Sequence, residues 1–299
     1  MTMTPRQLWA LLALTLMWGI NWPMMKLSLQ SMPPLHFRAI TMTGGTIWMM
    51  GYLYLKGVQL WPRKDQWASL ALLAIPNMLG WHTFAILGVK ELASGRAAIL
   101  GFTMPVWTVL ISVLFLGEKL SRRVAFAVLC ALTAITLLVW QEFATITGRP
   151  LGVLWMEIAA ISWAIGTLMI RRTQLALSAY AVTIWMMVMT SAALWIIAIM
   201  AEPWPFNPMP HYSWQFWGSM AYGVFINYGI AQLIWFGLAK NLPPATSAMS
   251  VMAVPLIGTL SATLIVGEQP HWQDYAAIIF VMLAIASVLL PKRQPSSQA

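Results

Sequence analysis

The chain has 299 residues, of which 60% are hydrophobic and 8% are charged, and its formal net charge is +9. A soluble globular protein carries about 25% charged residues, so this sequence cannot cover itself with polar surface, and lipid is its expected solvent. The Lys and Arg residues stand in short runs between apolar segments, which indicates topology signals rather than a nucleic-acid-binding surface. A single cysteine, Cys130, excludes a disulfide or a thiolate metal site within one chain.

Ten apolar segments follow one another, and each is long enough to cross a hydrocarbon core of about 30 Å. The predicted helices span residues 6–27, 34–56, 66–90, 94–117, 121–140, 150–171, 179–201, 214–239, 244–267 and 271–291. The first has only Arg6 before it and no small-residue cleavage site, so we interpret it as a retained span rather than a signal peptide. The expected fold class is an all-α integral membrane protein.

The basic residues predict the orientation. With the N-terminus in the cytoplasm, twelve Lys and Arg fall on the inner side and five on the outer side or at the adjoining helix ends. Cytoplasmic loops carry the excess of Lys and Arg. We therefore expect a multi-pass protein of the cell inner (plasma) membrane with both termini cytoplasmic.

Residues 92–120 and 242–270 are two versions of one segment, related by a constant offset of 150. The aligned identities include Asn77/Asn227, Lys90/Lys240, Pro105/Pro255 and Gly117-Glu118/Gly267-Glu268. The first helix of each half aligns at an offset of 145, which pairs Trp18 with Trp163. Each half has five spans, so the second half would be inverted, with units at 1–142 and 148–291 and a short cytoplasmic tail at 292–299. Inverted repeats place a transporter's substrate site near the bilayer midplane.

Pro105 and Pro255 fall near the middle of paired helices. Proline lacks the N–H of a helical hydrogen bond, and irregular backbone is permitted where it lines a cavity. The pair is therefore a candidate hinge, and a tolerated kink is the alternative.

Three amides, Asn21, Asn77 and Asn227, lie inside apolar spans, where an unbonded polar group is costly. They either contact substrate or bond one helix to another. Thr167 and Gln232 are weaker candidates of the same kind.

The chain has 18 Trp, most of them near predicted helix ends, as in an interfacial belt. Trp18, Trp81, Trp107 and Trp163 instead lie well inside spans. They would wall a cavity suited to flat aromatic or apolar side chains, and plain packing is the alternative for each.

Few ionisable residues enter the membrane, where such groups are functional candidates by default. Glu157 and Arg38 are candidates for a proton or charge role, and His82 is a second candidate proton carrier. Lys26 and Arg38 lie near outer helix ends, where each could snorkel to the interface or attract a substrate carboxylate. Motifs for a nucleophile, a zinc protease or a nucleotide-binding loop are absent from the sequence, so we expect no enzyme activity and no cofactor.

The chain resembles the drug/metabolite transporter superfamily, in its ten-helix EamA-type branch. The resemblance rests on LMWGINWPMMK at residues 16–26, PVWTVLISVLFLGEKL at 105–120 and VPLIGTLSATLIVGEQP at 254–270. Within that branch the chain is similar to YddG-type exporters of aromatic amino acids. The resemblance implies two inverted five-helix repeats and alternating access. It also implies a central cavity lined mainly by the first, third, fourth, sixth, eighth and ninth helices.

Carried onto this sequence, the resemblance implies a set of substrate-binding residues, to which we add His82. They are Trp18, Asn21, Asn77, Trp81, His82, Trp107, Trp163, Thr167 and Asn227. The expected function is export of amino acids or related metabolites with aromatic or large apolar side chains. Broad efflux of lipophilic drugs, with or without proton coupling, is the alternative. The expected partners are a small-molecule substrate and the lipid bilayer, with a monomer or homodimer as the functional unit and no nucleic acid.

Overall fold

The computed structural model describes residues 4–144, 149–204, 213–241 and 244–289, and every secondary-structure element in these ranges is a helix. The elements of the first half are α1 (Pro5–Ser28), α2 (Pro34–Leu55), the 3₁₀ turn η1 (Lys64–Gln66), α3 (Trp67–Ala74), the π-helix η2 (Ile75–Gly80), α4 (Trp81–Glu91), α5 (Ser94–Gly101), α6 (Met104–Leu116) and α7 (Arg122–Ala144). Those of the second half are α8 (Pro150–Arg172), α9 (Ala179–Ala201), α10 (Trp214–Ala221), the π-helix η3 (Tyr222–Ile230), α11 (Ala231–Asn241), α12 (Pro244–Val266) and α13 (Trp272–Leu289).

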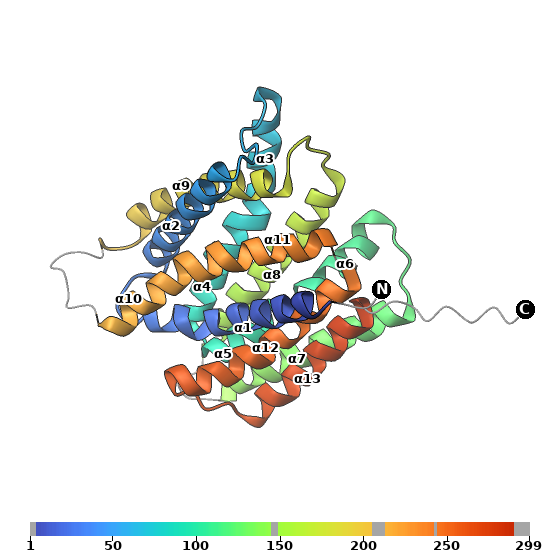
Figure 1. Cartoon of the computed structure of the whole chain (residues 1–299). Helices are drawn as coiled ribbons and strands as arrows, with labels where there is room; N and C mark the ends of the chain where they lie inside the picture. The colour runs from blue at the N-terminus through green and yellow to red at the C-terminus, as the bar shows by residue number, and fades with distance from the viewer. Residues whose placement is uncertain (1–3, 145–148, 205–212, 242–243, 290–299) are drawn as a thin grey trace, which may run out of the picture.

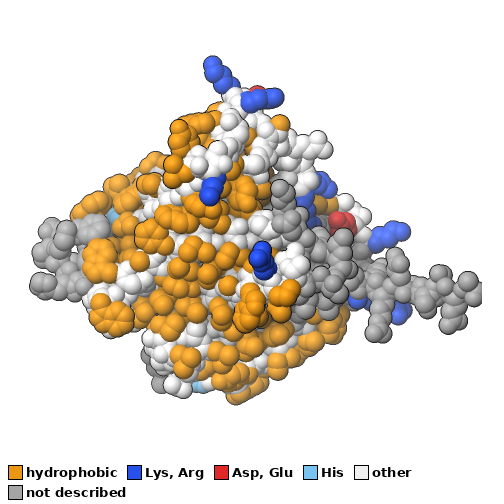
Figure 2. Space-filling view, viewed as in Figure 1, with side chains coloured by type: hydrophobic (Ala, Val, Ile, Leu, Met, Phe, Trp, Pro, Cys, Tyr) orange, Lys and Arg blue, Asp and Glu red, His pale blue; other side chains and the backbone are white. Residues whose placement is uncertain are grey.

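Within the described residues, seven helical segments are long and apolar enough to cross a membrane, and two shorter apolar helices follow them. α2 has 22 residues but is more polar, because it carries His36, Arg38 and three threonines. A broad hydrophobic face covers the side of the molecule shown in Figure 2, and the Lys and Arg in that view lie mostly toward its top and right. The protein is therefore a multi-pass membrane protein.

Segments far apart in the chain pack together. α1 lies against α12, α2 against α9, α4 against α8, and α7 against α13 (Figure 1). Small residues allow these approaches, as expected without a hydrophobic driving force between helices in lipid. A Cβ built on Gly166 of α8 would lie 2.5 Å from Asn77 Cβ and 2.6 Å from Asn77 Cα, so α8 rests directly on the backbone of η2.

The two helices with paired prolines differ. The first is interrupted at Phe102–Thr103, with α5 ending at Gly101 and α6 starting one residue before Pro105. The second, α12, continues through Pro255 without a break. The structure therefore interrupts the helix at one of the two predicted hinge positions, and a hinge role for either proline stays a prediction.

The Gly-Glu pairs end their helices, in agreement with the predicted helix bounds 94–117 and 244–267. Gly117 after α6 has φ 72° and Gly267 after α12 has φ 71°, the left-handed conformation that glycine adopts at helix C-termini. In both copies the following Glu donates its backbone N–H to a carbonyl six residues earlier, at 3.3 Å.

Candidate functional site

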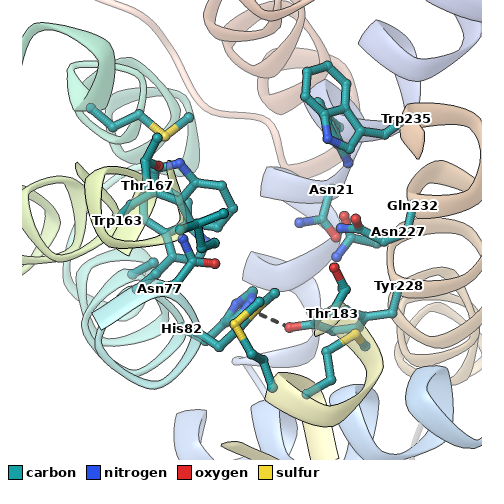
Figure 3. Close-up of a pocket in the computed structure, with 18 of the residues that line it drawn as sticks. Asn21, Asn77, His82, Trp163, Thr167, Thr183, Asn227, Tyr228, Gln232 and Trp235 are labelled. Carbon is teal, nitrogen blue, oxygen red and sulfur yellow. Dashed lines mark hydrogen bonds between the residues drawn. The ribbon is translucent and has the colours of Figure 1, made fainter. Parts of the chain in front are cut away.

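A cavity of about 580 Å³ lies among α1, α2, η2, α4, α8, α9, η3, α11 and the junction of α5 and α6, where Phe102 and Met104 line it (Figure 3). Eight of the nine predicted binding residues line it: Trp18, Asn21, Asn77, Trp81, His82, Trp163, Thr167 and Asn227. The ninth, Trp107, is not on the described wall, because its indole N–H donates to Glu157 at 2.7 Å. The structure thus gathers these residues from both halves of the chain, while their binding roles stay predictions.

The wall differs from the helix set implied by the resemblance. α9 contributes five residues, Ala179, Val182, Thr183, Met186 and Met187, and α2 contributes Arg38. α2 is the second and α9 the seventh of the ten predicted spans, so both lie outside the expected set. α12 is the ninth predicted span. The described side chains of α12, which begin at Ala253, do not line the cavity.

The π-helices present the amides. Asn77 lies in η2 and Asn227 lies in η3, at matching positions of the two halves. π-turns widen a helix locally and occur often at functional sites. In η2, Pro76 also lacks the N–H needed for a regular α-helical bond. Both amides are buried, and both border the cavity (Figure 3).

Aromatic pairs form two walls of the cavity. Trp81 and Trp163 have ring centroids 5.4 Å apart at an interplanar angle of 62°, and Trp18 and Trp235 lie 5.4 Å apart at 50°. Figure 3 shows Trp163 and Trp235 on opposite sides of the space. Such walls suit a flat or bulky apolar group, and the methionines of α9 add a surface that adapts to shape.

A polar chain crosses the cavity wall from α2 to α4. Arg38 donates through Nη1 to the Tyr228 hydroxyl at 2.9 Å and through Nη2 to the Met25 sulfur at 2.8 Å. The Tyr228 hydroxyl lies 3.2 Å from His82 Nδ1, the bond drawn in Figure 3.

Sequence reasoning missed several lining residues, including Trp22, Met25, Tyr228 and Trp235. Helical spacing could have found them. Met25 follows Asn21 by four residues and Trp22 follows Trp18 by four, and side chains at this spacing share one face. Tyr228 and Trp235 lie four residues before and three after Gln232, which was named as a weaker candidate and also lines the cavity.

The cavity has its exposed lining residues at one end of the described structure. Arg171 and Ala179 line it and are exposed, so its mouth lies where α8 ends and α9 begins. At the opposite end, Lys26 donates to the carbonyls of Val89, Lys90 and Leu92 at 2.9, 3.0 and 2.7 Å.

Glu268 completes the closed end by capping α5. Its carboxylate accepts from the Ser94 N–H at 2.7 Å, the Ser94 hydroxyl at 2.9 Å and the Gly95 N–H at 3.1 Å. A carboxylate is favoured at a helix N-terminus by the exposed N–H groups and the helix dipole. The cap joins the end of α12 to the start of α5.

Ion pairs tie further helix ends together on the same side. Arg96 pairs with Glu142 of α7 and, at 2.7 Å, with Asp274 of α13. Arg149 pairs with Glu91 at 2.9 Å, although that pair is partly exposed and contributes little by itself. Glu157 accepts from the Trp107 indole at 2.7 Å and from the Thr103 hydroxyl at 3.4 Å, and it is not part of the described cavity wall, so a proton role for it stays a prediction.

Comparison with known proteins supports a transporter. The sequence pattern of the EamA-like transporter family matches residues 6–140 and 150–290. An "Uncharacterized inner membrane transporter YedA" of Escherichia coli strain K12 is 27% identical over 289 residues, covering 95% of this chain and 90% of that protein. An "Uncharacterized transporter YoaV" of Bacillus subtilis strain 168 is 23% identical over 260 residues, covering 87% of this chain and 88% of that protein.

A solved structure, titled "Crystal structure of protein", has the same fold. It superposes with a TM-score of 0.64 at 22% identity, and covers 97% of this chain and 99% of its own. The fold, the enclosed cavity and the family match agree with one another. This chain belongs to the EamA-like transporter family of the drug/metabolite transporter superfamily, and is a membrane transporter of small molecules rather than an enzyme.

Proposed function

We propose that the protein exports amino acids or related small metabolites, favouring aromatic or large apolar side chains, from the cytoplasm across the cell inner membrane. The observation that carries this proposal is the cavity itself. It combines two tryptophan pairs and a methionine-rich helix with a few buried amides. Its volume of about 580 Å³ falls within the range of about 300–1,000 Å³ usual for small-molecule sites.

The proposed mechanism is alternating access of two inverted five-helix halves. The packing supports it, because exchanging the halves maps one set of contacts onto another. α1 against α12 becomes α8 against the α5–α6 pair, and α2 against η3 becomes α9 against η2. The two stretches matched by the family pattern, 6–140 and 150–290, also coincide with the proposed halves.

The cavity walls are paired in the same way. Positions 77 and 227 are both Asn, and positions 18 and 163 are both Trp. All four side chains border one space, as expected for a site between the two repeats. In the observed state, the cavity is open at the Arg171 end and closed at the Glu268 end. With both termini cytoplasmic, this state faces inward.

The test is flux of labelled Phe, Trp, Thr and a lipophilic cation in proteoliposomes, with and without a pH gradient. We expect saturable flux of Phe and Trp. Trp163→Ala and Asn77→Ala should raise the KM for Phe, because each removes part of the wall. Trp140→Ala is a matched control, since that side chain is 69% exposed and lies outside the cavity.

Efflux of lipophilic drugs is the competing function, and the largely apolar wall favours it. Gradient-driven movement of the cation without amino-acid flux would establish it and refute our proposal. Amino-acid flux that ignores the pH gradient would instead identify a facilitator and remove Glu157 and His82 as proton carriers.

A further inference from the structure

The side chain of Arg38 is a buried cation on the cavity wall. It lies in α2, borders the cavity and is 3% exposed, so it does not snorkel to an interface. Burying an ion costs several kcal/mol unless an opposite charge and further hydrogen bonds compensate. Arginine stays protonated in proteins, so this cost cannot be avoided by loss of a proton.

The described structure supplies that compensation only in part, through two hydrogen bonds and the Phe37 ring, whose centroid lies 6.0 Å from Arg38 Cζ. A guanidinium has five N–H donors. Arg38 uses one on the Tyr228 hydroxyl and one on the sulfur of Met25, which is a weak acceptor, and its buried Nε has no partner in the described residues. Its hydrogen bonding is therefore incomplete.

No carboxylate pairs with Arg38 either. All eight Asp and Glu side chains of the chain belong to the described residues, and the ion pairs among these residues involve other partners. The described cavity wall itself contains no Asp or Glu. The described wall therefore carries the positive charge of Arg38 with no carboxylate beside it.

Two other cations show that this arrangement is not general in the protein. Lys26 donates to three backbone carbonyls, and Arg96 lies between two carboxylates. Both belong to the closed end, and neither lines the cavity. Arg38 differs because it borders the cavity and its Nε has no partner in the described residues.

We propose that Arg38 binds the carboxylate of the transported molecule, so that a carboxylate is required of every good substrate. This inference rests on the proposed function and adds the recognition element to it. The guanidinium fork matches a carboxylate in two-point geometry, and the Tyr228 hydroxyl holds that fork in place. The rest of the substrate then lies along the tryptophan walls.

A buried cation is present in one half only, because Arg171, which also lines the cavity, is exposed at its mouth. At the offset of 145, position 38 corresponds to Thr183, which also lines the cavity. The cavity thus carries one such group, which predicts a single carboxylate per substrate. A lipophilic cation would meet a like charge in a desolvated space and is disfavoured.

The first experiment compares two isosteric probes, 3-phenylpropanoate and 3-phenylpropanamide, by isothermal titration of the purified wild-type protein. A charge-assisted hydrogen bond contributes about 1.5–3 kcal/mol, so we expect the carboxylate to bind about tenfold to a hundredfold more tightly than the amide. Equal affinity would overturn the inference, and would mean that another anion, such as chloride, satisfies Arg38.

The second experiment uses variants. Arg38→Gln should abolish the preference for the carboxylate, and Arg38→Lys should keep part of it, because the charge remains while the planar fork is lost. Arg63→Gln, at an exposed arginine outside the cavity, should behave as wild type. If Arg38→Gln still prefers the carboxylate, the proposal is refuted. If Arg38→Gln does not fold, the proposal is decided by the titration of the wild-type protein with 3-phenylpropanoate and 3-phenylpropanamide.

The outcomes separate the two proposals. If Phe is transported and Arg38→Gln moves it with an unchanged KM, the carboxylate subsite is wrong while the amino-acid function stands. If 3-phenylpropanoate binds in an Arg38-dependent way but Phe is not transported, the subsite stands and the amino-acid assignment is wrong.

Discussion

Gly166→Ala tests whether the contact between α8 and η2 shapes the cavity. The added Cβ would lie 2.5 Å from Asn77 Cβ, 2.6 Å from its Cα and 2.7 Å from its backbone nitrogen. Ordinary contacts between carbon atoms are about 3.5–4.0 Å, so the two segments must separate locally by about 1 Å. Two of the three close atoms are backbone, and a rotamer change cannot relieve the clash.

Overpacking of this kind costs about 1–3 kcal/mol. The displaced residue is Asn77 itself, and Trp163 lies one turn away on α8, so the binding wall moves with the backbone. We expect Gly166→Ala to lower the temperature of thermal inactivation in detergent and to raise the KM for Phe in proteoliposomes.

Gly51→Ala is the matched control. Gly51 lies inside α2, and a Cβ built there meets no atom within 4 Å. Alanine is a better helix former than glycine by about 0.5–1 kcal/mol, so this variant should equal or exceed wild-type stability and leave KM unchanged. If Gly166→Ala matches Gly51→Ala in both measurements, the contact does not constrain the cavity and the reasoning fails.

Two further substitutions test the closed end and the buried carboxyl. Glu268→Gln removes the charged cap of α5, and a charge at a helix N-terminus contributes about 0.3–2 kcal/mol. We expect a membrane-impermeant maleimide to label Thr167→Cys faster from outside in this variant, in a Cys130→Ser background. An unchanged labelling rate would show that the Glu268 cap does not hold this end of the cavity closed. Glu157→Gln keeps an acceptor for the Trp107 indole at 2.7 Å and should preserve stability, whereas Glu157→Leu orphans that N–H and should cost about 1–3 kcal/mol in chemical denaturation. Equal stability of the two Glu157 variants would show that the indole bond is not required.

The spans were the most predictable part of the structure. Residues 150–171 were expected to be helical, and α8 covers Pro150–Arg172; residues 121–140 were expected, and α7 covers Arg122–Ala144. Length and apolar composition decide such segments, because every backbone group in lipid must bond within its own helix. The repeat also gave the correct helix ends at Gly117 and Gly267.

The site residues that could be predicted from the sequence are polar residues inside an apolar span. Asn77 and Asn227 were visible for that reason, but the widened π-turns that hold them were not. In the first half, η2 packs on Gly166, which lies 89 positions after Asn77. The sequence around Asn77 does not indicate a contact with a residue so far along the chain. The burial of Arg38 has a similar origin, since its partner Tyr228 is 190 positions away.

Trp107 shows the limit of counting along one helix. Its position inside an apolar span suggested a place on the cavity wall. The interruption at Phe102–Thr103 changes the helical phase of everything after it, and the indole contacts Glu157 instead. Helical spacing predicts a shared face only while the helix is continuous.

The helices around Pro105 and Pro255 differ in continuity, and this difference bears on the fraction of time that the protein spends in the inward-facing and outward-facing states. In the proposed inverted repeat, two identical halves would make the inward-facing and outward-facing forms equivalent by a two-fold rotation in the membrane plane. The two forms would then have equal free energy, and each would be occupied half the time. Here the helix before Pro105 is interrupted while α12 runs unbroken through Pro255. Symmetry therefore does not require the two forms of this chain to be equally occupied.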